Sequence, residues 1–188
     1  MRIACVGGGP AGLYFAALMK QLDPNHEIDV WERNDAGDTF GFGVVFSDET
    51  LSGIDNADAS FYAAMRREFA IWDDIDVHYR DTVHTSGGHA FAAMSRKRLL
   101  ALLQERCAEL GVHPKFRCEA PNPRELARDY DLVVAADGVN SSVRHEFADD
   151  FQPTIATGLI WRRDRTQEQA DLQRLIDSTK RALAGTMA

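Results

Sequence analysis

Three closely spaced glycines near the N-terminus have the spacing that most clearly implies chemistry. The segment IACVGGGPAGLYF places Gly7, Gly9 and Gly12 in the pattern Gly-x-Gly-x-x-Gly, directly after a short apolar run. In this pattern the first glycine permits a tight turn, the second lets the backbone approach a diphosphate, and the third lets a helix pack closely on a strand. The helix that follows would point free N–H groups and its positive dipole end at that diphosphate. The spacing therefore predicts a dinucleotide site.

An acidic residue lies where it would complete this site. Glu32 follows Gly12 by about 20 residues, the distance typical of the acid that binds a ribose diol. Its negative charge would repel a 2′-phosphate, so the sequence favours FAD or NAD over NADP as the ligand. The alternative interpretation is a glycine-rich structural turn with a glutamate on the surface.

The residues around the glycines predict the elements that would hold them. Residues 2–6 are mostly apolar and predict a strand. Pro10 then opens an amphipathic helix, since proline suits the first helical turn, and the segment 23–25 ends it. Residues 27–34 predict a second strand. Strand, glycine turn, helix and strand make a βαβ unit with a parallel pair, so the fold class predicted is α/β, a Rossmann-like parallel sheet with flanking helices.

The pattern between residues 36 and 96 is less regular. Residues 36–47 are rich in glycine and indicate a loop with a short strand, and residues 61–75 have the periodicity of a helix. Residues 77–96 alternate in polarity and contain Gly87-Gly88, which is typical of a β-hairpin. We therefore expect a small hairpin element in addition to the parallel sheet.

The later part of the chain returns to helices and strands. Ser95 is a candidate N-cap for an amphipathic helix that Gly111 would end. Residues 112–118 predict a strand and residues 121–126 a polar connection. Residues 130–138 predict a buried parallel strand that ends in a turn, and another helix follows it.

Composition and charge disfavour several classes of protein. The chain has 188 residues, enough for one domain with an appendage, and its net charge of −8 disfavours nucleic acid or an anionic membrane as partner. No apolar run is long enough to span a membrane or to act as a signal peptide. The three cysteines form no CxxC pair and indicate free thiols of a cytoplasmic protein. The six histidines lack metal-ligand spacing, so we expect no metal site.

Three segments, in the same order, resemble the FAD-dependent aromatic hydroxylases, the flavoprotein monooxygenases of the para-hydroxybenzoate hydroxylase type. The first is GGGPAGLYFA followed by WERN. The second, SRKRLLALL, is similar to the family's Arg-x-x-Leu-x-x-x-Leu helix, with Arg96 in register. The third, DLVVAADGVNSSVR, is similar to its Asp-Gly segment, with Asp137, Gly138 and Arg144 in register. In addition, GFGVVFSDETL at 41–51 resembles the hydroxylase domain of the salicylyl-CoA 5-hydroxylases and 2-aminobenzoyl-CoA monooxygenases.

The resemblance implies how the remaining residues would serve the cofactor. In that family the helix arginine reaches the FAD diphosphate, and the Asp-Gly segment lies near the FAD and is linked to use of the nicotinamide cofactor. A solvated arginine and a plain turn are the alternatives for these two features. The cofactor-binding residues expected from pattern and resemblance together are Gly7, Gly9, Pro10, Ala11, Gly12, Glu32, Arg33, Gly43, Arg96, Asp137, Gly138 and Arg144. No catalytic residue is named, because in this family the flavin carries the reaction.

The resemblance covers residues 1–155 and implies an FAD-binding domain, the N-terminal part of an NAD(P)H-dependent aromatic monooxygenase. When complete, such an enzyme hydroxylates a small aromatic substrate or its CoA thioester with O2, through a flavin C4a-hydroperoxide. Residues 156–188 depart from the family: its later Gly-Asp segment is missing, and one amphipathic helix is indicated instead. We therefore expect an incomplete domain with a divergent tail.

Two alternatives to an active monooxygenase stay open. The chain could be a truncated module that binds a dinucleotide without turnover. It could also be an NAD-dependent dehydrogenase, although no catalytic Lys, Tyr or His can be placed in the pattern.

Overall fold

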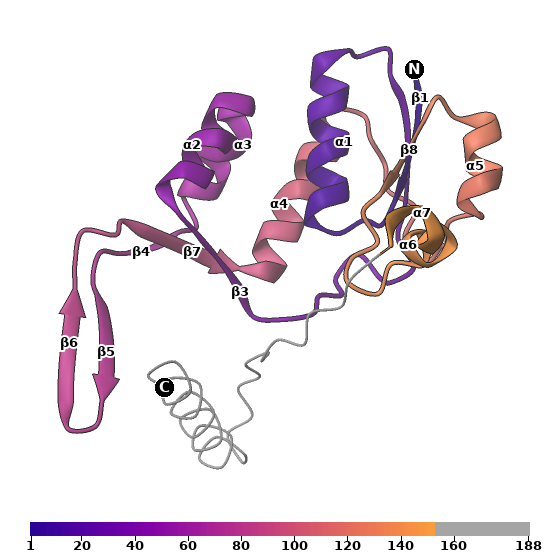
Figure 1. Cartoon of the computed structure of the whole chain (residues 1–188). Coiled ribbons are helices and arrows are strands. Elements are labelled where there is room, and N and C mark those ends of the chain that lie inside the picture. Colours follow the sequence, from indigo (N-terminus) through magenta and orange to yellow (C-terminus); the bar gives the residue numbers. More distant parts are fainter. Residues whose placement is uncertain (153–188) are drawn as a thin grey trace. The chain divides into compact units, whose positions relative to one another are not determined.

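The first two strands of the chain belong to a three-stranded parallel sheet (Figure 1). The computed structural model describes residues 1–152, so the tail helix expected within 156–188 lies outside the described residues. In the sheet, β1 (Arg2–Val6) lies between β2 (Glu27–Trp31) and β8 (Leu132–Ala135), and both neighbours pair with it in parallel. The predicted βαβ unit is confirmed.

Helix α1 (Pro10–Leu22) connects β1 to β2 and begins where the sequence predicts, with proline in its first turn. Its buried residues are Gly12, Leu13, Ala16 and Ala17, which recur at helical spacing. Because most of these side chains are small, α1 lies close against β1 and against α4 (Arg96–Glu109). The glycine turn is therefore held between a buried strand and a buried helix.

Helix α4 supplies much of the remaining core. Ser95 is its N-cap, and the Ser95 hydroxyl accepts a hydrogen bond from the backbone N–H of Arg98 at 3.2 Å, as predicted. Gly111, with φ +80°, follows its end, also as predicted. The buried side chains of α4 are Leu99, Leu100, Leu102, Leu103 and Cys107. Burial of one leucine side chain contributes roughly 1.5–3 kcal/mol, so α4, and with it Arg96 in its first turn, is held firmly against α1.

Two thiols lie in this core. Cys5 of β1 and Cys107 of α4 are both 0% exposed, and the Cys107 thiol donates a hydrogen bond to the carbonyl of Leu13 at 3.3 Å. Cys118 is half-buried. All three cysteines are free thiols, as predicted.

A second sheet is antiparallel, in the order β3-β7-β4. It consists of β3 (Gly43–Phe46), β7 (Phe91–Ser95) and β4 (Ala70–Trp72), with α2 (Asp48–Ala57) and α3 (Ala59–Arg66) between β3 and β4 in the chain. A separate hairpin, at the left of Figure 1, is formed by β5 (Ile75–Tyr79) and β6 (Thr82–Ser86). The later helices are short: α5 (Pro123–Asp129), α6 (Ser142–Glu146) and α7 (Ala148–Phe151).

The helix predicted over residues 61–75 is wrong in its second half. α3 ends at Arg66, and Ala70–Trp72 form β4, which pairs with β7. Ile71 and Trp72 are residue types that suit a strand, so pairing with a neighbour overrides the helical periodicity of this stretch.

The hairpin turn predicted at Gly87-Gly88 is misplaced. The turn is Arg80-Asp81, and Arg80 takes the positive φ of +53° that a two-residue turn requires. Gly88, with φ +79°, instead lies where the chain leaves β6 for β7. A non-glycine residue in the left-handed region gives no turn signal, which is why the pattern pointed to the wrong position.

The strand predicted at 112–118 is reduced to a single bridge between Lys115 and Trp31. Arg117 has φ +52°, and Cys118 instead of Arg117 donates its N–H to the Glu32 carbonyl, so regular pairing stops after Lys115. The segment nevertheless runs along β2, because the N–H of Lys115 donates to the Val30 carbonyl at 2.8 Å and its carbonyl accepts from the N–H of Glu32 at 2.9 Å. It therefore fixes the backbone at the end of β2.

Two further element predictions differ from the structure. The polar connection at 121–126 is largely helical, because Asn122 caps α5 by accepting a hydrogen bond from the N–H of Arg124 at 2.8 Å. β8 is half-buried rather than buried, since within residues 1–152 it pairs only with β1. In the same part of the chain, no helix has both the length and the apolar character needed to cross a membrane.

Candidate functional site

Two of the three patterned glycines are required by the protein itself. Gly7 has φ +107°, and a Cβ there would lie 2.4 Å from the carbonyl oxygen of Ala136. A Cβ on Gly12 would lie 2.0 Å from the carbonyl oxygen of Gly7. These contacts confirm a tight turn at Gly7 and close packing of α1 at Gly12, the structural roles that the sequence predicts for them.

Gly9 differs, because no packing contact among residues 1–152 requires a glycine there. A Cβ on Gly9 would meet nothing within 4 Å, and its φ of −75° suits any residue. Gly9 is the N-cap of α1, and no side chain caps that helix. The space in front of the helix N-terminus is therefore open to a group from outside, and the positive end of the helix dipole favours an anionic one.

Glu32 lies at the end of β2 and bonds back to the glycine turn. Its Oε2 accepts a hydrogen bond from the N–H of Gly8 at 2.9 Å. Its Oε1 accepts two more from Asn34, from the backbone N–H and from the side-chain amide, each at 2.8 Å. Sequence reasoning missed both Gly8 and Asn34. Gly8 has its own steric reason, since a Cβ there would lie 2.7 Å from the Cβ of Glu32.

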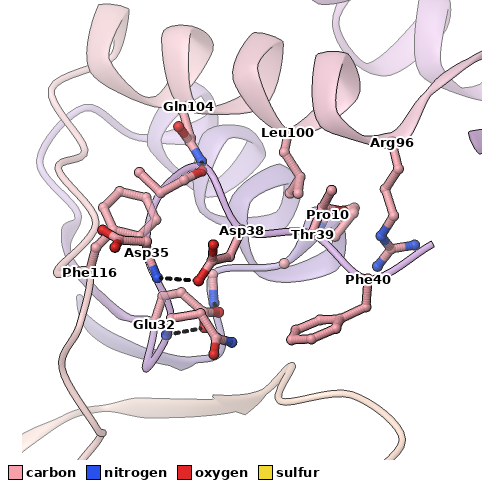
Figure 2. A pocket seen from close by; sticks show the side chains of 14 residues that line it. Pro10, Glu32, Asp35, Asp38, Thr39, Phe40, Arg96, Leu100, Gln104 and Phe116 are labelled. Atoms are coloured by element: carbon pink, nitrogen blue, oxygen red, sulfur yellow. Dashed lines mark hydrogen bonds between the residues drawn. The ribbon is translucent and has the colours of Figure 1, made fainter. Parts of the chain in front are cut away.

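A pocket opens between the glycine turn, the loop after β2 and α4 (Figure 2). It has an empty volume of ≈ 400 Å³. Of the predicted cofactor residues it brings together Gly9, Pro10, Glu32 and Arg96. The other lining residues are Gly8, Asn34, Asp35, Ala36, Asp38, Thr39, Phe40, Leu100, Gln104 and Phe116.

Arg96 is a cation that has no anionic partner in the described part of the chain. Its backbone N–H donates to the Phe42 carbonyl at 3.0 Å, but its Nε is buried with no hydrogen-bond partner, and it makes no ion pair within residues 1–152. Figure 2 shows its guanidinium beside Phe40, on the side of the pocket that Pro10 borders. Thr39, in the same lining, has a buried hydroxyl oxygen that also finds no hydrogen-bond partner among these residues. A cation in the first turn of a helix is unfavourable to the dipole, so the arrangement suits an anion bound in this pocket.

The acidic loop that forms one wall is tied down at two points. Asp35 pairs with Arg117, and this hydrogen bond holds the pKa of the Asp35 carboxyl below its usual range. The Gln104 side chain of α4 donates to the carbonyl of Ala36 at 2.9 Å. The wall is therefore fixed relative to both α4 and the segment along β2.

Asp137 lies next to the glycine turn but uses its carboxylate elsewhere. Its backbone nitrogen is 2.8 Å from the position that a Gly7 Cβ would take. Its Oδ2 accepts hydrogen bonds from the N–H of Ser142 at 2.7 Å, from the hydroxyl of Ser142 at 3.1 Å and from the N–H of Val143 at 3.3 Å. Burial raises the pKa of Asp137, but hydrogen bonds from hydroxyl and N–H groups of the 141–143 segment outweigh burial and lower it. The side chain thus supports the start of α6.

The other predicted cofactor residues lie outside the pocket lining. They are Gly7, Ala11, Gly12, Arg33, Gly43, Asp137, Gly138 and Arg144. Arg33 is exposed, and Gly43 lies in β3, where a Cβ would be 3.1 Å from the Met94 carbonyl oxygen. Gly138 has φ +80° and turns the chain after Asp137. Arg144 donates to the carbonyl of Val139, and Glu146 pairs with Arg124 instead.

Most of the chain is similar to known proteins. Residues 5–41, which include the glycine turn and Glu32, match the family described as an NAD(P)-binding Rossmann-like domain. Salicyloyl-CoA 5-hydroxylase from Streptomyces sp is 51% identical over 164 residues, which are 86% of this chain and 32% of that protein. Over these residues the chain is similar to that hydroxylase. This confirms the predicted resemblance to aromatic hydroxylases.

Two further proteins that are similar to the chain are named as monooxygenases. A 3-hydroxy-4-methyl-anthranilyl-[aryl-carrier protein] 5-monooxygenase from Streptosporangium sibiricum is 35% identical, over 86% of this chain and 46% of that protein. Protodeoxyviolaceinate monooxygenase from Chromobacterium violaceum is 32% identical, over 86% and 44%. The chain thus spans less than half the length of each curated relative.

Solved structures support the fold of the chain. 2-Methyl-3-hydroxypyridine-5-carboxylic acid oxygenase has a TM-score of 0.66 at 24% identity, over 78% of this chain and 42% of that one. PqsL from P. aeruginosa has a TM-score of 0.65 at 16% identity, over 85% and 48%. At these identities the likeness concerns the fold alone, and the predicted Rossmann-like α/β class is confirmed.

Proposed function

We propose that residues 1–152 form the part of an FAD-dependent aromatic monooxygenase that binds the adenosine diphosphate half of FAD. The observation that carries this proposal is the buried, unpartnered Nε of Arg96 in the same pocket as the open Gly9 and the carboxylate of Glu32. A dinucleotide offers the complementary groups, an anionic diphosphate and a ribose diol.

The residues of the pocket fit those groups. Backbone N–H groups at the start of α1, together with Arg96 and the Thr39 hydroxyl, would hold the diphosphate, and Glu32 would accept a hydrogen bond from the ribose. Gly138 and the backbone of Asp137 would border the ligand beyond Gly7, as the family resemblance implies. The bound flavin would supply the redox chemistry with O2, and these residues would hold and orient it.

The proposed reaction is hydroxylation of an aromatic compound with NAD(P)H as reductant. The names of two relatives support an aromatic acyl substrate, because one refers to salicyloyl-CoA and the other to an anthranilyl group on an aryl-carrier protein. The proposed domain spans residues 1–155, and the proposed compartment is the cytoplasm, where free thiols such as Cys5 and Cys107 persist.

A second candidate is a module that binds the dinucleotide without turnover. The observation that favours it is the lining of the pocket, where Gly9, Glu32 and Arg96 offer groups that match a diphosphate and a ribose. The pocket described above serves this candidate as well as the first.

The test is binding and turnover by the purified full chain. We expect FAD to bind, measured by quenching of flavin fluorescence, and NADH to bind more weakly. Formation of one hydroxylated product per reduced flavin from an aromatic acyl thioester would support the monooxygenase, and peroxide alone would support the binding module. If the chain binds neither FAD, NAD nor FMN, both the monooxygenase and the binding module are contradicted.

A further inference from the structure

The carboxylate of Glu32 is held by two neighbours in unequal ways. Oε1 accepts two hydrogen bonds from Asn34, whereas Oε2 accepts one from Gly8. A carboxylate has about four lone-pair directions, so the acceptor capacity that remains lies on Oε2. Asn34 thus occupies one oxygen and leaves the other, next to the glycine turn, for a ligand.

The backbone at this point is fixed without the Asn34 side chain. The carbonyl of Glu32 accepts from the N–H of Cys118 at 2.9 Å, and the carbonyl of Asn34 accepts from the N–H of Arg117 at 3.0 Å. With the bond between Lys115 and Glu32 described above, the segment 115–118 holds residues 32–34 in place. Changes to the Asn34 side chain therefore alter the carboxylate without moving the strand.

We infer that Asn34 is a positioning residue for the ribose, and this inference rests on the proposed function. Its side-chain amide donates to Oε1 and stops the Glu32 carboxylate from rotating, so that Oε2 stays beside Gly8 at the edge of the pocket. An acid at position 34 would have the same shape but would place a second negative charge 2.8 Å from Oε1. The amide is therefore the group that this position needs.

The matched control is already present in the chain. Asn25 bonds to Asp23 in the same way, through its backbone N–H at 2.9 Å and its side-chain amide at 3.0 Å, but on the surface after α1. Asn25→Asp thus creates the same pair of carboxylates away from the pocket.

The experiment measures FAD affinity of the full chain at pH 8 and pH 5.5 for wild type, Asn34→Asp, Asn34→Ala and Asn25→Asp. We expect Asn34→Asp to bind about tenfold more weakly at pH 8 and to recover at pH 5.5, because a protonated acid can again donate to Glu32. Asn34→Ala should be weakened at both pH values, and Asn25→Asp at neither. The other charged groups around the pair, Asp35 with Arg117, Asp38 and Arg96, are common to all variants, so affinities are compared as ratios to wild type.

The outcomes distinguish failure of the positioning role of Asn34 from failure of the proposed function. If wild type binds FAD and both Asn34 variants bind equally well, the positioning role is overturned and the proposed function stands. A loss in Asn34→Asp that matches Asn34→Ala at both pH values also overturns it. If wild type binds no dinucleotide, the proposed function fails and this inference fails with it. Should Asn34→Asp not fold, Asn34→Ala against Asn25→Ala decides by the same comparison at pH 8.

Discussion

Arg96 shows at the scale of a single residue how an unfavourable arrangement points to a ligand. The cation lies in the first turn of α4, and its Nε has no partner within residues 1–152. We expect Arg96→Ala to weaken FAD binding by about 10- to 100-fold, because a hydrogen bond to a charged group contributes about 1.5–3 kcal/mol. Titration of flavin fluorescence measures it. Arg128→Ala, an exposed arginine of α5, is the control and should bind like wild type.

The glycines give a matched pair of substitutions. Gly12→Ala should destabilise the fold by about 1–3 kcal/mol or more, since its Cβ would lie 2.0 Å from the Gly7 carbonyl oxygen. Gly9→Ala should destabilise the fold by at most about 1 kcal/mol, since nothing lies within 4 Å and only the preference for glycine at the N-cap is lost, but it should weaken FAD binding. Urea unfolding and the fluorescence titration distinguish the two effects. Equal affinity in Gly9→Ala and wild type would mean that no ligand approaches this backbone.

At this scale the sequence predicted the residues that carry a recognisable spacing. The glycines and Glu32 have such a spacing, and Arg96 was found through family resemblance. Asn34 and Thr39 were missed for different reasons. Asn34 bonds to Glu32 only two positions away, and that spacing alone does not indicate a ligand site. Thr39 joins the pocket lining only when the loop after β2 folds, and no periodicity marks that contact.

Asp58 connects three helices and belongs to the scale of elements. Its backbone ends α2, its Oδ1 accepts from the N–H of Phe61 at 3.0 Å at the start of α3, and its carboxylate pairs with Arg106 of α4 at 2.8 Å. The Asp58 side chain is 1% exposed. We expect Asp58→Ala to cost about 3 kcal/mol or more, because it leaves Arg106 without its buried partner and α3 without its cap.

A neighbouring carboxylate provides the comparison for Asp58. Glu109 also pairs with Arg106, at 2.9 Å, but its side chain is 64% exposed. Glu109→Ala should therefore cost less than about 1 kcal/mol in urea unfolding. Equal losses in the two variants would contradict the view that burial decides the strength of this cluster.

The start of α6 makes stability depend on pH. The folded-state pKa of Asp137 is lowered, so its contribution is present above the unfolded pKa and is lost as pH falls below about 4. Asp137→Asn should reduce stability by about 0.5–2 kcal/mol at neutral pH, the range for loss of a cap, and should flatten the decline in acid. Unfolding midpoints between pH 7 and pH 3 measure this. A parallel decline in both proteins would rule out Asp137 as its source.

Elements with strong local signals were predicted, and elements that need a distant partner were not. Ser95 and Gly111 mark the ends of α4 within the sequence itself. β4 exists because Ala70–Trp72 find β7, some 20 residues later, and Arg80 adopts a positive φ because β5 and β6 pair around it. These are tertiary effects that a local pattern does not contain.

For the molecule as a whole, stability should be unevenly distributed along the chain. β1 is buried and paired on both sides, whereas every residue of β5 and β6 is exposed and the two strands pair only with each other in the described range. An isolated two-stranded hairpin is marginally stable. Hydrogen exchange should therefore be faster in 75–86 than in 2–6, and comparable protection in the two segments would contradict this expectation.

The reactivity of the two core thiols, Cys5 and Cys107, reports how often the core opens. Burial, with the nearby Cys107, raises the pKa of Cys5 to about 12, and burial raises that of Cys107 to about 11. Neither sulfur is then reactive while the sheet and α4 stay together, since only a thiolate attacks an alkylating agent. Mass spectra taken over time after adding iodoacetamide should show one label early, on Cys118. Labels on Cys5 and Cys107 should follow at the rate at which the core opens. The rate at which the last two labels appear would thus measure the rate of core opening, and a saturating dinucleotide should lower that rate.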